Sequence, residues 1–173
     1  MRFSSCRALT QIAPAGRNFS YHQTLGAIAS KTFENMKITF TYASQKDFKW
    51  LSDAEKGHEI TSTMLKRKIQ DKEVLLVKAD NKLIGWLRFG FFWDEVPFMN
   101  MLGLDKEHRG KGIGKKLVRF WEAEMKKKKY KMVMTSSQSN EDAQHFYRKI
   151  GYADVGSLTL PKEPLEVIFI KKI

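Results

Sequence analysis

The chain has 173 residues, of which 42% are hydrophobic, and a net charge of +12. This length exceeds that of a minimal core and the apolar fraction is ordinary, so composition predicts one compact globular domain. The single cysteine, Cys6, excludes an intramolecular disulfide. The four histidines occur at no metal-ligand spacing, which predicts solvated surface positions for them and no metal site.

Charge and hydropathy limit the partners that the chain can take. Its longest apolar stretches are interrupted by Arg88 and Asn100 and stay shorter than a membrane span, so no membrane contact is expected. The basic charge would suit nucleic acid, but cationic residues also attract a small ligand that is rich in phosphate. Charge alone therefore does not decide between these partners.

The first 35 residues differ in composition from the rest, because they carry four basic residues against a single acid. This composition is typical of a mitochondrial presequence, and residues 17–20 resemble a matrix-protease cleavage site. An upstream start or an appended segment is the competing explanation. We therefore expect an extension at 1–35, one domain at 36–173, and a cytoplasmic protein, with the mitochondrial matrix as the alternative if 1–35 is a presequence.

Hydrophobic periodicity predicts the elements of the domain in chain order. A strand at 37–42 is followed by two helices between residues 48 and 69, with a break near Gly57. Two strands then flank a hairpin turn at Asp80-Asn81, and a third strand precedes a long amphipathic helix that begins near Ile113. The predicted strands and the last helix lie at 74–78, 82–92, 97–104, 132–136, 152–160 and 165–171, with the helix beginning near Asn140. The alternation indicates an α/β sandwich with a mixed sheet.

A glycine-rich stretch at 109–114 joins the third of these strands to the long helix. Glycines allow backbone N–H groups to turn toward an anion, and the helix N-terminus adds positive potential, so the stretch is a candidate phosphate cradle. A Walker loop is excluded because Gly114-Lys115 is followed by Lys116 instead of Ser or Thr. A dinucleotide fingerprint would require its third glycine where Lys115 stands.

The stretch resembles the coenzyme A loop of the GNAT superfamily of N-acetyltransferases, whose pattern Arg109, Gly112 and Gly114 match. About thirty residues downstream, residues 140–152 resemble the family segment Asn-x-x-Ala-x-x-Phe-Tyr that ends in Gly-Phe or Gly-Tyr. The resemblance spans residues 36–173. It implies a mixed, mostly antiparallel central sheet flanked by helices, in which the strand at 98–104 splays away from the one at 132–136 to bind acetyl-CoA.

The resemblance also implies the residues that hold this cosubstrate. Backbone groups of the splayed strand would pair with the pantetheine arm, and the loop would hold the pyrophosphate. By chemistry alone Asn140 is only an N-cap, and Ser139 with Asp142 forms a capping pattern, whereas the family gives Asn140 a pantetheine contact. The implied binding residues are Leu102, Gly103, Leu104, Arg109, Gly110, Lys111, Gly112, Ile113, Gly114 and Asn140.

The implied reaction is direct transfer of an acetyl group to a primary amine, without a covalent enzyme intermediate. Tyr147 would be the general acid that protonates the departing thiolate, and a backbone N–H near Leu102 would stabilise the oxyanion. For the base, Glu95 is narrowly preferred over Asp94 or a water chain. The aromatics at 91–93 would contact a cationic acceptor, although an acidic hairpin tip with packing aromatics explains the same residues.

Two other classes of function stay open at this point. The domain could bind acyl-CoA as a sensor or partner module without catalysing transfer, although the presence of Tyr147 argues against it. A nucleic-acid-binding protein is less favoured because only charge supports it. The expected partner is a small-molecule or peptide amine, which no motif identifies further, and a homodimer is an open alternative to a monomer.

Overall fold

The computed structural model describes residues 36–58 and 60–173. The predicted extension at 1–35, with Cys6 and His22, lies outside the described residues. The helices and strands follow the predicted order βααβββαβαββ, with two short 3-10 turns added. Their bounds are β1 Ile38–Tyr42, η1 Gln45–Asp47, α2 Phe48–Ala54, α3 Ser62–Gln70, β2 Val74–Ala79, β3 Lys82–Phe92, β4 Val96–Leu104, η2 Lys106–His108, α4 Ile113–Lys127, β5 Met132–Gln138, α5 Ala143–Lys149, β6 Ala153–Leu158 and β7 Glu166–Lys172.

The strands form one seven-stranded sheet in the order β1-β2-β3-β4-β5-β7-β6. Neighbouring strands are antiparallel except β4 and β5, which are parallel and pair through only two residue pairs, Phe98 with Met134 and Met99 with Thr135. The Thr135 hydroxyl also donates to the Met99 carbonyl oxygen at 3.0 Å. Beyond these contacts the two strands separate, so the mixed, mostly antiparallel sheet contains the predicted splay.

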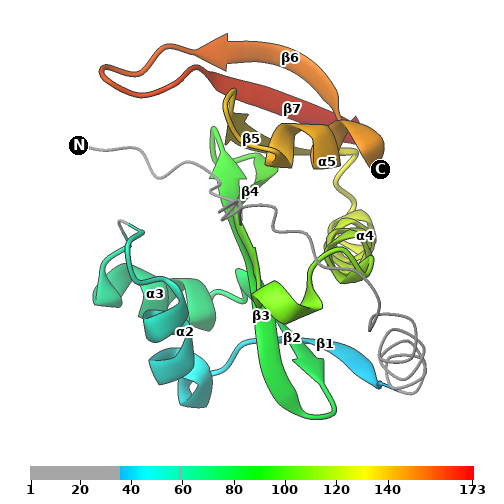
Figure 1. Cartoon of the computed structure of the whole chain (residues 1–173). Helices are drawn as coiled ribbons and strands as arrows, with labels where there is room; N and C mark the ends of the chain where they lie inside the picture. Colours follow the sequence, from blue (N-terminus) through cyan, green and yellow to red (C-terminus); the bar gives the residue numbers. More distant parts are fainter. Residues whose placement is uncertain (1–35, 59) are drawn as a thin grey trace, which may run out of the picture.

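Helices cover both faces of the sheet, and Figure 1 shows α2 and α3 on the opposite side of β3 and β4 from α4. On the α4 face, Leu117 and Trp121 pack with Phe89 from β3 in the larger core cluster. On the other face, Leu51 of α2 and Leu65 of α3 pack in a second cluster against β2 and β3. The strands between them are buried on both faces, which explains why β2 reads as a continuous apolar run.

A bulge in β4 changes which face its side chains occupy. Arg88 of β3 pairs with Met101 and the next residue, Phe89, pairs with Met99, so Asn100 is an extra residue in β4. Met99 and Met101 would share a face in a regular strand, yet they belong to opposite core clusters. The bulge therefore sets the orientation of everything from Met101 to the end of β4.

A buried ion pair fixes the end of α2 against β3. The Glu55 carboxylate accepts hydrogen bonds from Arg88 Nε at 2.8 Å, from Arg88 Nη2 at 3.3 Å and from Trp86 Nε1 at 3.0 Å. The side chains of Glu55 and Arg88 are 2% and 8% exposed, so both charges are removed from water and satisfied by each other. This network holds Trp86 in one orientation.

Two sequence predictions about turns have different outcomes. The hairpin turn at Asp80-Asn81 is confirmed, with φ of 46° and 71° at its two residues. The predicted capping pattern of Ser139 with Asp142 is wrong, since α5 begins at Ala143 and Asp142 is its N-cap. The Ser139 N–H instead donates to the Leu165 carbonyl oxygen at 2.8 Å, which continues the pairing of β5 with β7 by one residue.

Candidate active site

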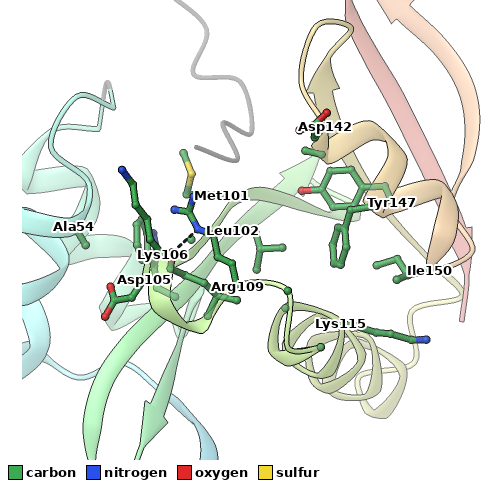
Figure 2. A pocket seen from close by; sticks show the side chains of 18 of the residues that line it. Ala54, Met101, Leu102, Asp105, Lys106, Arg109, Lys115, Asp142, Tyr147 and Ile150 are labelled. Carbon is green, nitrogen blue, oxygen red and sulfur yellow. Dashed lines mark hydrogen bonds between the residues drawn. The ribbon is translucent and has the colours of Figure 1, made fainter. Parts of the chain in front are cut away.

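A cavity of about 1010 Å³ opens where β4 leaves β5. Its lining comes from the end of α2, the end of β4, the glycine loop, the first turn of α4, and α5, and Figure 2 shows side chains from these elements around one space. The lining residues are Trp50, Asp53, Ala54, His58, Trp86, Met101, Leu102, Gly103, Leu104, Asp105, Lys106, Arg109, Gly110, Gly112, Gly114, Lys115, Asp142, Ala143, Phe146, Tyr147, Lys149 and Ile150.

The glycine loop has the backbone conformation that an anion cradle requires. Gly110 and Gly112 have φ of 71° and 76°, a left-handed region that glycine adopts without strain. Gly112 is the N-cap of α4, so the unpaired N–H groups of the first helical turn border the cavity. Arg109 Nε donates to the Leu104 carbonyl oxygen at 2.9 Å, which ties the loop back to the end of β4.

The last residues of β4 form one wall of the cavity. Leu102, Gly103 and Leu104 all line it, and they lie beyond the last residue of β4 that pairs with β5. A Cβ at Gly103 would lie 2.4 Å from the Trp86 ring, so only glycine permits this ring to pack against the strand. The wall is therefore thin, with Trp86 directly behind the backbone.

Tyr147 reaches the cavity from α5. Its side chain is only 1% exposed and contacts the rings of Phe146, Tyr152 and Phe169. In Figure 2 its hydroxyl points from α5 toward the side of the cavity where Leu102 lies. Packing on three rings holds the phenol in place, as a residue that acts on a bound ligand requires.

Other residues predicted from the sequence lie outside the cavity lining. Lys111 is exposed and its Nζ donates to the Glu107 carbonyl oxygen, Ile113 is a core residue, and Asn140 is exposed before α5. Glu95 is exposed in the turn between β3 and β4, at the opposite end of β4 from the cavity. About seven residues, or about 23 Å of extended strand, separate it from Leu102.

The predicted acceptor aromatics at 91–93 also lie away from the cavity. Phe91 packs against Phe89 and Tyr130, while Trp93 is 81% exposed beside Phe92. The hairpin tip is thus an ordinary surface turn with packing aromatics, which was the competing explanation. It contributes no residue to the lining of the cavity.

Several lining residues were missed by the sequence reasoning. Trp50 and Trp86 form an edge-to-face pair with centroids 5.9 Å apart, and Asp53 and His58 lie beside them. His58 is half-buried, which corrects the expectation of a solvated position, and so is His108. Two tryptophans near the splayed strand were the available signal, but periodicity alone does not show that they meet.

One buried carboxyl, Glu166, lies outside the lining of the cavity. It begins β7, is 4% exposed, and neither oxygen accepts a hydrogen bond of good geometry among the described residues. Burial raises the pKa of Glu166, the nearby Ser136 hydroxyl partly offsets this rise, and the negative charge of Glu163 adds to it. Ionisation of Glu166 is therefore less favourable in the folded protein than in the unfolded chain.

Glu166→Gln should raise the melting temperature at pH 8 by a few degrees, with a smaller gain as the pH falls toward 4. Below the ordinary carboxyl pKa, Glu166 is protonated in both the folded and the unfolded protein, so its ionisation takes nothing from the folding stability. As the pH rises through the elevated folded-state pKa, a buried carboxyl must ionise and stability is lost. Thermal melts across this pH range measure the effect, and Glu95→Gln, an exposed match, should show none. An equal gain at both ends of the range would contradict this account.

The described residues contain no group of three or more His, Cys, Asp or Glu that could hold a metal ion. None of the described helices combines the length and apolar character needed to cross a membrane. The arrangement is that of an α/β fold in which a glycine-rich loop and a buried tyrosine line one cavity.

Comparisons with known proteins assign this fold to a family. The model of the acetyltransferase (GNAT) family matches residues 38–152, which is more than half of the chain. The chain belongs to the GNAT acetyltransferase family, and this membership supports an acyltransferase. No curated protein matches the sequence.

Solved structures share the fold at low sequence identity. Ard1 from Thermoplasma volcanium is similar with a TM-score of 0.68 and 12% identity, over 79% of this chain and 97% of that one. The PaiA N-acetyltransferase from Thermoplasma acidophilum, solved with coenzyme A, has a TM-score of 0.65 and 21% identity over 80% and 100%. Arabidopsis thaliana Naa50, solved with the bisubstrate analogue CoA-Ac-MVNAL, has a TM-score of 0.66 and 17% identity over 79% and 99%.

Proposed function

We propose that this chain is an acetyl-CoA-dependent N-acetyltransferase that transfers the acetyl group directly to a primary amine. The observation that carries the proposal is the single cavity that joins the glycine loop, the splayed end of β4 and Tyr147. The family match and the coenzyme A named with the PaiA structure support the choice of cosubstrate.

The residues present fit coenzyme A. A pyrophosphate suits the left-handed glycines at 110 and 112 and the N-terminus of α4, with Arg109 and Lys115 supplying positive charge. The backbone groups of Leu102, Gly103 and Leu104, which β5 does not pair, suit the amides of a pantetheine arm. Lys111, Ile113 and Asn140 would act from beside the lining, the first two through their place in the loop backbone.

Gly112→Ala should weaken acetyl-CoA binding by about tenfold or more. An alanine Cβ at φ of 76° strains the backbone, and strain at this point turns the N–H groups away from the cradle. Isothermal titration calorimetry with acetyl-CoA measures the change. Gly57→Ala is the matched control, since Gly57 has φ of 89° and equally open space around it but lies outside the cavity. Unaltered binding by the Gly112 variant would remove the loop from the proposed site.

Each step of the transfer has a candidate group. Tyr147 would protonate the departing sulfur, and a backbone N–H near Leu102, where the Asn100 bulge breaks the pairing of β4, would stabilise the oxyanion. The ammonium proton needs another route because Glu95 lies far along β4. We propose that water carries this proton, and Glu95→Gln would change the pH profile of kcat/KM only if the relay ends at that carboxylate.

Release of free thiol from acetyl-CoA in the presence of pooled amines tests the proposal. The pools are aminoglycosides, polyamines, amino acid amides and short peptides, and acetylated products are identified by mass spectrometry. Amine-dependent thiol release with a matching acetylated product would support the transferase. Coenzyme binding without release from any pool would instead favour an acyl-CoA sensor.

A further inference from the structure

The cavity passes from one face of the sheet to the other. Gly112, Gly114 and Lys115 belong to the side on which α4 packs. Trp50 and Trp86 belong to the side on which α2 and α3 pack. The two sides are joined where β4 and β5 separate (Figures 1 and 2). We call the second part the α2-side half, and it is lined by Trp50, Asp53, Ala54, His58, Trp86 and Met101.

The α2-side half has a largely apolar wall with a fixed shape. The Trp50 and Trp86 rings meet edge to face at 84°, and Met101 lies on the same face as Trp86. The hydrogen bond from Trp86 Nε1 to Glu55 fixes one ring, and the close backbone of Gly103 supports it from behind. Rigid aromatic walls bind apolar groups at little entropic cost.

The charges around this half do not suit a polycation. The Asp53 carboxylate already pairs with Lys56 at 2.7 Å, and the nearby Glu55 carboxylate is occupied by Arg88. The chain as a whole carries +12, so it repels a ligand with several positive charges. Two further carboxylates of the lining, Asp105 and Asp142, lie on opposite sides of the cavity in Figure 2 and form no cluster with each other. A polyamine or aminoglycoside would therefore find separate carboxylates and no favourable long-range field.

We propose that the α2-side half binds an acceptor whose reactive amine is attached to a bulky apolar group, and that Trp50 and Trp86 determine this preference. The inference rests on the proposed acetyl transfer. The amine can belong to a small molecule or to the first residue of a peptide, since both present the same chemistry to the two rings.

A matched panel tests this with the full chain and acetyl-CoA. Leucinamide and tryptamine represent small apolar amines, a tetrapeptide that begins with Leu represents a peptide source, and glycinamide, putrescine and spermidine are the comparisons. We expect kcat/KM for the apolar amines to exceed that for glycinamide and the polycations by at least about tenfold. The ratio between leucinamide and the tetrapeptide distinguishes the two sources.

Trp50→Ala should raise KM for the best apolar amine by about tenfold and leave KM for acetyl-CoA unchanged, because Trp50 lines the α2-side half and packs on the opposite side of the sheet from α4. Trp93→Ala, which removes an exposed tryptophan outside the cavity, should change neither constant. Faster turnover of spermidine or putrescine, or an unchanged KM in Trp50→Ala, would overturn the inference and leave the transferase intact. Silence from every amine would overturn the proposed function, and the inference with it.

Discussion

Tyr147→Phe should lower kcat by about a hundredfold or more, while the Kd of acetyl-CoA changes by less than about threefold. Tyr147 lines the cavity from α5, and its ring packs on three other rings. Because the substitution keeps the ring and removes only the hydroxyl, the shape of the site should stay unchanged. In the proposed transfer, the proton of Tyr147 would matter most when the sulfur develops negative charge. Steady-state kinetics and calorimetry on the same preparation separate these two quantities.

Tyr152→Phe is the matched control for this experiment. Tyr152 is also buried, its ring lies 5.8 Å from that of Tyr147, and it does not line the cavity. Removal of its hydroxyl should leave kcat nearly unchanged. Equal rates in the wild type and Tyr147→Phe would remove Tyr147 from the acid role, and equal losses in both variants would indicate a packing effect.

Glu55→Ala should lower the free energy of unfolding by about 3–5 kcal/mol, because it leaves a buried guanidinium without its carboxylate partner. Arg88 is 8% exposed in its side chain and would lose its hydrogen bonds to the carboxylate. The Trp86 N–H would lose its acceptor as well. Urea unfolding followed by tryptophan fluorescence measures the change.

Two further variants show whether the loss comes from the unpaired charge. Asp154→Ala breaks a surface pair with Arg148, in which the side chains are 46% and 38% exposed, and should change the free energy of unfolding far less than Glu55→Ala does. The double variant Glu55→Leu with Arg88→Met removes both buried charges and should recover much of the stability lost in Glu55→Ala. A double variant as unstable as the single one would mean that packing, not charge, makes the difference.

The order of the elements could be predicted because its signals are local. The β3 strand was predicted with its observed bounds at 82–92, and the Asp80-Asn81 turn before it has the left-handed φ values that such residues adopt readily. The glycine loop could be predicted equally well, since its glycines and the start of α4 lie within six residues of one another. These features depend on neighbours in the chain.

The α2-side half of the cavity could not be predicted in the same way. Trp50 and Trp86 are 36 positions apart and meet only because α2 packs on β3, with Glu55 holding its end. Glu95 is close to Leu102 in the sequence but lies outside the cavity, because an extended strand separates its residues by more than about 3 Å at each step. The helix α5 begins later than the capping pattern at Ser139 predicted, because the Ser139 N–H donates to Leu165 next to β7.

The extra residue in β4 determines how this strand would respond to a change in its length. Deletion of Asn100 would remove the bulge and leave Met101 paired with Arg88 and Gly103 paired with Trp86, so the later positions would keep their present faces of the sheet. Gly103 would therefore stay against the Trp86 ring. Deletion of Leu102 would instead keep the bulge and move each later residue by one position, so Leu104 would meet the Trp86 ring in place of Gly103. The position of a single-residue deletion in β4 therefore decides whether this wall of the cavity keeps its packing.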